Sequence, residues 1–317
     1  MLNIFFLRAN GGFSLINITT DDSLGNPPQL EAVRLELAGL AVHALSAGPA
    51  DAPLVLLLHG FPEFWTEWRG IMAPLAASGL RVVAPDQRGY NLTGKAGPYD
   101  LRTVADDAAR LIAALGYERA HVVGHDWGGA VAWALAAWHP QRVERLAVIN
   151  LPHPLALAEA LAHGNWRQAL RSWYIAFFQI PRLPEWLLRR NESALLRRTL
   201  RGSARPGAYS DADLAEHVAA WSQPGALSAM LGWYRAVWRS RRLVLASRPQ
   251  FERIAAPTLI LWGEQDVALG VELAEASRRY LSDGRLVRFP QASHWLPKEQ
   301  PQVVAQHLLA HLKPGAE

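Results

Sequence analysis

The chain has 317 residues, of which 50% are hydrophobic and 19% are charged. This length and composition allow a substantial buried core and exclude a disordered or low-complexity protein. The absence of cysteine excludes disulfide bonds, thiolate metal sites and a cysteine nucleophile. No apolar run reaches the roughly 18 residues that a membrane-spanning helix needs. We therefore expect a cytoplasmic protein of one large domain, or one domain with an insertion, and no membrane span.

The net charge of +4 is distributed unevenly. Residues 151–250 contain 14 Arg and six Asp or Glu, a net charge of +8, so the rest of the chain is acidic. The Arg pairs at 189/190, 197/198 and 241/242 are separated by apolar residues at helical spacing, which is typical of solvated faces on amphipathic helices. We expect no nucleic-acid partner; an anionic surface or partner is the lesser alternative.

The first 30 residues differ from the rest of the sequence. The apolar stretch 2–7 is too short for a signal peptide and has no basic region before it. The following residues are polar and rich in Gly, Asn and Thr, with Pro27 and Pro28 near the end. We expect residues 1–30 to be a poorly ordered leader that carries no chemistry.

From residue 31, short aliphatic runs alternate with longer segments rich in Ala and Leu, as in an α/β layered fold. Several of the runs are apolar nearly throughout, as expected of strands buried on both faces of a parallel sheet. The predicted strands are 33–37, 41–46, 54–58, 81–84, 121–123, 145–149, 258–262 and 286–289. The predicted connecting helices are 103–115, 128–138, 270–281 and 300–312.

Between about residues 151 and 250 no strand pattern is present, and Trp, Leu, Ala and Arg recur at helical intervals. Prolines at 152, 154 and 249 bound this region, because proline disfavours a continuing helix. We predict that residues 151–250 form a helical cap inserted into a core made of residues 31–150 and 251–317.

The sequence Gly124-His-Asp-Trp-Gly-Gly-Ala130 joins a predicted strand directly to a predicted helix. Small residues around one central side chain favour a strained turn that exposes a nucleophile at the top of a sheet. The central residue here is Asp126. A carboxylate needs no activation to attack carbon, so it could open a strained ring or expel a halide and form an alkyl-enzyme ester. The alternative is that Asp126 only caps the following helix.

An acid and a histidine follow in the chain order that such a site uses. Asp266 follows the strand 258–262, and His294 follows the strand 286–289. A carboxylate that orients an imidazole produces a general base, so we predict this role for the pair. Glu264 is the second candidate for the acid, and a solvated turn is the alternative interpretation of each residue.

The strand 54–58 ends in His59-Gly-Phe-Pro62, at the position where an oxyanion hole receives one of its backbone donors. We predict that the N–H groups of Phe61 and Trp127 are the two donors. The alternative is that the Gly and Pro of this segment simply form a turn.

Taken together, five motifs resemble those of the epoxide hydrolases with an α/β-hydrolase fold, and the resemblance covers roughly residues 31–312. It implies a mostly parallel eight-stranded sheet flanked by helices, with the helical cap inserted after the sixth strand. The motifs are His59-Gly-Phe-Pro-Glu-Phe-Trp-Thr-Glu-Trp-Arg69, Asp86-Gln-Arg-Gly-Tyr90, Gly124-His-Asp-Trp-Gly-Gly129, Trp262-Gly-Glu-Gln-Asp266 and Ser293-His-Trp295.

The resemblance also implies how the chemistry is divided. Asp126 would form the ester, His294 with Asp266 would drive its hydrolysis, and two cap tyrosines, similar in position to Tyr174 and Tyr234, would hold the epoxide oxygen. Each tyrosine could instead be a packing residue with a hydrated hydroxyl. The expected substrate-contacting residues are Phe61, Pro62, Trp127, Phe178 and Trp295. The expected partners are a small apolar epoxide and water, without metal or cofactor, in a monomer or homodimer.

Two other functions are compatible with parts of this pattern. Dehalogenases of the same fold share the Asp, the His and the Trp after the nucleophile, but they generally use an Asn after the His-Gly pair, or a His-Trp pair with an Arg beside the nucleophile, to bind halide. Phe61 follows His-Gly here, so this set is incomplete. A catalytically silent ligand-binding relative would lack a catalytic residue, and none is missing. His307 and His311 have helical spacing but no third metal ligand in view, which indicates a surface pair.

Overall fold

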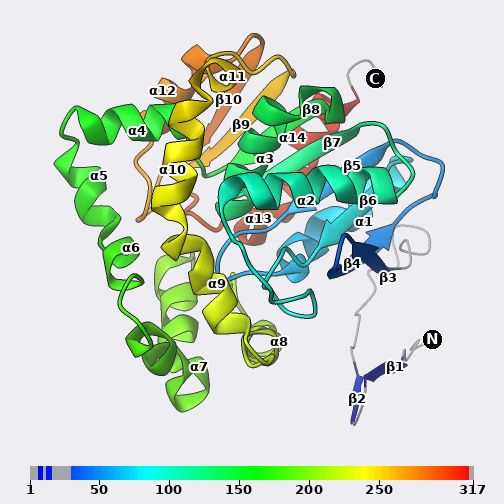
Figure 1. Cartoon of the computed structure of the whole chain (residues 1–317). Helices are drawn as coiled ribbons and strands as arrows, with labels where there is room; N and C mark the ends of the chain where they lie inside the picture. Colours follow the sequence, from blue (N-terminus) through cyan, green and yellow to red (C-terminus); the bar gives the residue numbers. More distant parts are fainter. Residues whose placement is uncertain (1–5, 10–11, 16–29, 314–317) are drawn as a thin grey trace.

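The computed structural model describes residues 6–9, 12–15 and 30–313 (Figure 1). Its centre is an eight-stranded sheet in the order β10-β9-β8-β7-β5-β6-β4-β3. β4 pairs antiparallel with β3 and β6, and the other neighbours are parallel. The strands are β3 (Glu31–Leu37), β4 (Leu40–Ala47), β5 (Leu54–Leu58), β6 (Arg81–Pro85), β7 (Ala120–His125), β8 (Val143–Ile149), β9 (Thr258–Gly263) and β10 (Gly284–Phe289). All eight predicted strands are confirmed, with ends that differ by at most two residues.

Helices cover both faces of the sheet because its central strands are apolar on both sides. In β5, Leu54, Leu56 and Leu58 pack toward α2 (Leu101–Ala114) and α3 (Trp127–Trp138). Val55 and Leu57 alternate with them and pack toward α1 (Arg69–Ala77) and α14 (Pro301–Leu312). The shorter helical elements of this part are η1 (Trp65–Trp68), η2 (Pro140–Arg142), α12 (Glu272–Ser277), η3 (Arg278–Tyr280) and α13 (Leu296–Glu299).

Helix α1 is the longest helix of the core that the sequence pattern did not predict. Its nine residues include Gly70 and Pro74, which both disfavour a helix in isolation. Ile71, Met72 and Leu75 are nevertheless fully buried. Packing against the sheet and α14 therefore overrides the weak local propensity.

The chain between β8 and β9 contains only helices, and we call residues 150–257 the helical insertion. Figure 1 shows it in green and yellow, on one side of the sheet. Helix α7 is kinked at residues 190–193, where the backbone is not helical. The helices are α4 (Pro154–Ala162), α5 (Trp166–Arg171), α6 (Trp173–Phe177), α7 (Leu183–Ser203), α8 (Asp211–Trp221), α9 (Ala226–Arg235), α10 (Val237–Ala246) and α11 (Arg248–Phe251).

The expectation of a poorly ordered leader over residues 1–30 falls mostly on residues outside the described ranges. The two short stretches that are described form an antiparallel pair, β1 (Phe6–Ala9) and β2 (Gly12–Leu15), which the sequence pattern did not predict. Within the described ranges, none of the helices combines the length and the hydrophobicity needed to cross a membrane.

Candidate active site

Asp126 occupies a sharp turn between the end of β7 and the start of α3. Its backbone has φ 49° and ψ −124°, a conformation that costs energy for a residue with a side chain. A Cβ atom on Gly128 would lie 2.0 Å from the backbone oxygen of Leu58, and one on Gly124 would lie 2.2 Å from the oxygen of Gly128. The strand and the helix therefore approach closely enough only because these positions are glycine.

The Asp126 side chain does not cap helix α3. It makes no capping hydrogen bond; instead Oδ1 accepts the backbone N–H of Phe61 at 2.8 Å. Oδ2 lies 3.6 Å from Nε2 of His294. The Asp126 side chain remains 15% exposed, whereas the Asp266 side chain is fully buried. This geometry presents a carboxylate to incoming molecules.

His294 is held on its other side by Asp266, as the sequence predicts. Nδ1 of His294 lies 2.6 Å from Oδ2 of Asp266. The second oxygen of Asp266 accepts the backbone N–H groups of Ala268 at 2.7 Å and Leu269 at 2.9 Å. The acid is thus fixed in its loop and leaves the histidine little freedom to rotate.

The three side chains set each other's charge. Burial alone would lower the pKa of His294, but the charge of Asp266 and the hydrogen bonds and charge from both carboxylates raise that pKa well above its usual value. Burial acts to raise the pKa of Asp126, but the hydrogen bond and charge of His294 lower it below its usual range. The raised pKa of His294 therefore favours a protonated imidazole in the resting site, beside Asp126 and Asp266.

The structure also separates the alternative candidates from this site. Glu264 is directed away from it, with Oε1 lying 2.7 Å from Nε of Arg288. Nε2 of His311 lies 3.0 Å from the backbone oxygen of Leu146, so this ring is engaged with the sheet. Over the described ranges, no three His, Cys, Asp or Glu side chains are grouped so that they could hold a metal ion.

Asn150 is a residue of the site that the sequence did not reveal. It follows β8, is fully buried and has φ 46°. Its Nδ2 donates to Oδ2 of Asp266 at 2.8 Å, and its Oδ1 accepts the N–H of Gly263 at 2.9 Å. The amide therefore ties the end of β8 to the strand and loop that carry the acid. An asparagine after a strand usually indicates only a turn, so no sequence signal distinguished it.

The predicted aromatic residues come together above Asp126, around the ring of Tyr234. Its centroid lies 5.1 Å from that of Phe61 and 5.2 Å from that of Trp127. The rings of Tyr174 and Phe178 lie 5.8 Å and 4.9 Å from it. The core contributes Phe61 and Trp127, and the helical insertion contributes the other three. The insertion is therefore packed directly against the loop and the helix that hold the carboxylate.

The two tyrosines of this cluster keep their protons. Burial raises the pKa of Tyr174 and that of Tyr234, and the negative charge of Asp126 raises both further. The hydroxyls therefore remain hydrogen-bond donors throughout the neutral range. Trp295 lies beside His294, with ring centroids 4.9 Å apart, and donates its indole N–H to Ser203 at 2.8 Å.

A second buried group of polar residues connects the insertion to the His59–Pro62 segment. Oε1 of Glu63 accepts the hydroxyl of Tyr209 at 2.5 Å, and its Oε2 lies 2.9 Å from Nε2 of His217. Burial opposes ionisation of Glu63, yet the His217 charge lowers the Glu63 pKa to about 2. The indole N–H of Trp221 donates to the backbone oxygen of Pro62 at 2.7 Å. These contacts fix α8 to the loop that carries the Phe61 donor.

Comparison with known proteins agrees with this architecture. Residues 53–301 match the family described as alpha/beta hydrolase fold. The chain belongs to this family. It is 43% identical over 280 residues to AB hydrolase superfamily protein YfhM of Bacillus subtilis, covering 87% of this chain and 95% of that protein. It is 38% identical over 290 residues to human Epoxide hydrolase 4, and the match covers 89% of this chain and 78% of that protein.

Solved structures extend the same relationship. The crystal structure of Epoxide Hydrolase A from Mycobacterium thermoresistibile superimposes with a TM-score of 0.79 at 28% identity, covering 90% of this chain and 99% of the other. The predicted α/β-hydrolase fold and the resemblance to epoxide hydrolases are both confirmed. This α/β-hydrolase is an enzyme of the epoxide hydrolase-like type.

Proposed function

We propose that this α/β-hydrolase adds water to an apolar epoxide and releases a vicinal diol, through an ester between the substrate and Asp126. The observation that carries the proposal is the setting of the Asp126 carboxylate. It receives the Phe61 N–H, faces His294 at 3.6 Å and lies beneath an aromatic cluster that includes two protonated tyrosines. A nucleophile, a base and donors for a leaving oxygen are thus present together.

The first step opens the ring. The Asp126 carboxylate attacks one epoxide carbon, a new C–O bond forms, and the bond from that carbon to the ring oxygen breaks. Tyr174 and Tyr234 donate hydrogen bonds to the oxygen as its negative charge develops. The former ring oxygen then takes up a proton and becomes a hydroxyl group. His294 loses one proton in this step, so the number of protons is conserved. We assign residues 151–250 as the cap that supplies the two tyrosines.

The second step hydrolyses the ester. Once Asp126 is esterified it has no negative charge, so it no longer raises the pKa of His294. The pKa of His294 then falls, and the neutral imidazole can act as a base. It removes a proton from water, which attacks the ester carbonyl of Asp126 while the Phe61 and Trp127 N–H groups hold the oxyanion. Collapse of this intermediate releases the diol with the second water proton and restores the carboxylate.

A panel of substrates tests this function against the dehalogenase alternative. Phe61 stands where a halide-binding Asn would be expected, so we predict faster diol formation from styrene-type and aliphatic epoxides than halide release from haloalkanes or fluoroacetate. Chromatography of diols and a halide assay on the same enzyme preparation provide the two readouts. Halide release that exceeds diol formation across the panel would contradict the proposal.

A further inference from the structure

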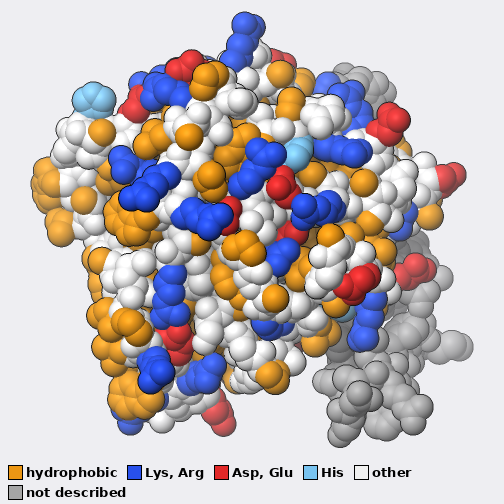
Figure 2. Space-filling view, viewed as in Figure 1, with side chains coloured by type: hydrophobic (Ala, Val, Ile, Leu, Met, Phe, Trp, Pro, Cys, Tyr) orange, Lys and Arg blue, Asp and Glu red, His pale blue; other side chains and the backbone are white. Residues whose placement is uncertain are grey.

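The helical insertion exposes an unusual amount of apolar surface. Of the 13 large hydrophobic side chains that are exposed in the described ranges, ten lie in this insertion, including Trp166, Trp173 and Trp186. Figure 2 shows hydrophobic side chains along the edge of the molecule that α4 to α7 form in Figure 1. A tryptophan side chain is large, and contiguous apolar patches of this kind mark surfaces that bind a partner.

Helices α5 and α6 carry the densest part of this surface. Trp166, Leu170 and Trp173 are 64%, 63% and 65% exposed. Trp166 and Leu170 lie about one turn apart on α5, and Trp173 is the first residue of α6. The ring of Phe177, which is half-buried against the core, lies 6.1 Å from that of Trp173. On the other side, Gln168 is buried and bonds to the backbone of residue 268 at 2.9 Å. The exposed side chains are therefore not needed to pack these helices against the core.

The charged side chains of this segment itself have one sign, and the Glu272 carboxylate lies 3.4 Å from Nδ2 of Asn165 at the start of α5. Between residues 160 and 184 there are three arginines, at 167, 171 and 182, and no Asp or Glu. The Arg167 guanidinium lies 5.5 Å from the centre of the Trp166 ring. Arg190 lies 4.6 Å from the ring of Trp186 on α7. Helices that lie on a membrane surface combine arginine with exposed Trp and Leu side chains, as this segment does.

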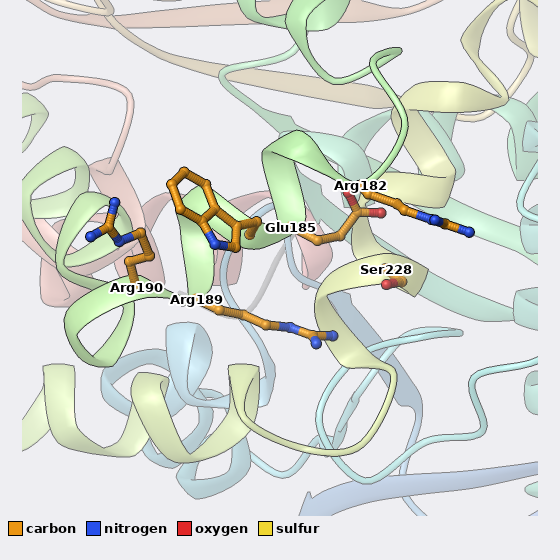
Figure 3. A pocket seen from close by; sticks show the side chains of 6 residues that line it. Arg182, Glu185, Arg189, Arg190 and Ser228 are labelled. Atoms are coloured by element: carbon orange, nitrogen blue, oxygen red, sulfur yellow. The ribbon is translucent and has the colours of Figure 1, made fainter.

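A cavity of about 430 Å³ between α7 and α9 could bind an anionic group next to this surface. Arg182, Arg189 and Arg190 line it, and in the view of Figure 3 the side chains of Arg182 and Arg189 run on either side of Ser228. Glu185 also lines it, but its carboxylate already binds Arg235 at 2.6 Å and 3.0 Å. The cavity thus has a positive excess that suits a phosphate.

We propose that the outer face of the insertion, made of Trp166, Arg167, Leu170, Arg171 and Trp173 and extending to α7, binds the surface of membranes that contain anionic phospholipids. The apolar side chains would enter the headgroup region while the arginines contact phosphates. A second copy of the chain fits less well, because a symmetric contact would place arginines against arginines. Nucleic acid offers no partner for an aliphatic side chain such as Leu170.

One consequence rests on the proposed function. Tyr174 belongs to the same short helix as Trp173 but faces the aromatic cluster over Asp126. Binding through the outer face would therefore hold the epoxide site next to a phase in which apolar substrates dissolve. The binding itself is measured without substrate, so its failure and the failure of the hydrolase proposal are distinguishable.

Co-sedimentation of the full chain with vesicles tests the surface. We expect binding to phosphatidylcholine vesicles that contain phosphatidylglycerol, weaker binding to phosphatidylcholine alone, and a decrease as salt is raised. Trp166→Ser, Leu170→Ser and Trp173→Ser together should weaken binding by about tenfold or more. Arg167→Gln with Arg171→Gln should weaken it by about fivefold per arginine. Trp238→Ser, on α10, is the matched control and should bind as the wild type does.

Circular dichroism should show that all variants are folded, because the replaced side chains are exposed. Equal binding to both kinds of vesicle, or wild-type binding by the triple and the arginine variants, would overturn the proposal. So would a wild-type dimer in solution that the triple variant abolishes, since the occupant would then be a second copy. If single-stranded DNA bound through the same residues and displaced the vesicles, the surface would be a nucleic-acid site and the membrane proposal would be wrong.

Discussion

Replacing His294 with glutamine is expected to stop the reaction at a covalent intermediate. Attack by the Asp126 carboxylate needs no base, so the first step should still proceed, whereas hydrolysis of the ester should not. We expect kcat to fall by about 10⁴-fold or more, as for other members of a catalytic triad. Intact-mass spectrometry of the variant after incubation with a good substrate should show an adduct of substrate mass, on the peptide that contains Asp126.

Two further variants control this experiment. His294→Gln combined with Asp126→Asn should show no adduct, because the nucleophile is absent. His163→Gln replaces an exposed histidine on the insertion and should leave turnover unchanged. An unmodified His294→Gln protein after long incubation would count against the ester, since the carboxylate is still present in this variant and water can supply the proton that the ring oxygen takes up.

Removing both tyrosine hydroxyls over the site is expected to nearly abolish alkylation. Losing one of two donors to a developing oxyanion typically costs about 2.7 to 4 kcal/mol, or 10² to 10³ in rate. Tyr174→Phe and Tyr234→Phe should each show a loss of this order and retain activity through the other hydroxyl. The two losses should not add simply, because both groups act on one oxygen atom.

Single-turnover rates of ester formation in the His294→Gln background measure this effect directly. Tyr117→Phe is the control, since the Tyr117 hydroxyl binds backbone oxygens of residues 50 and 52, away from Asp126. Near-native diol formation by the double tyrosine variant would remove the tyrosines from the mechanism. Combined with preferential halide release by the wild type, it would favour the dehalogenase alternative.

The sequence was informative where local patterns determine structure. The eight strands follow from apolar runs of the right length, and Asp126, Asp266 and His294 follow from their positions after three of those strands. Parallel strands bring their carboxyl ends to one edge of the sheet, so residues far apart in sequence meet there. Glu264, the second candidate for the acid, occupies the same loop as Asp266, and the structure separates the two by their directions: Asp266 contacts His294 and Glu264 contacts Arg288.

Other features depend on contacts that no local pattern encodes. The geometry that makes Asn150 a partner of Asp266 arises from two segments more than 100 residues apart. The same holds for Glu63, whose partners Tyr209 and His217 come from the insertion. Helix α1 has poor helix propensity and forms because the sheet buries it. In each case tertiary packing supplies the information that a single sequence lacks.

The origin of the diol oxygen is the most direct test of Asp126 as the nucleophile. In a single turnover with excess enzyme in heavy-oxygen water, the account predicts a diol without the label, because its new hydroxyl oxygen comes from the Asp126 carboxylate. The label should instead appear in that carboxylate, as a mass increase of the peptide that contains Asp126. Label in the diol during the first turnover, with an unlabelled peptide, would show direct attack by water and contradict the proposed mechanism.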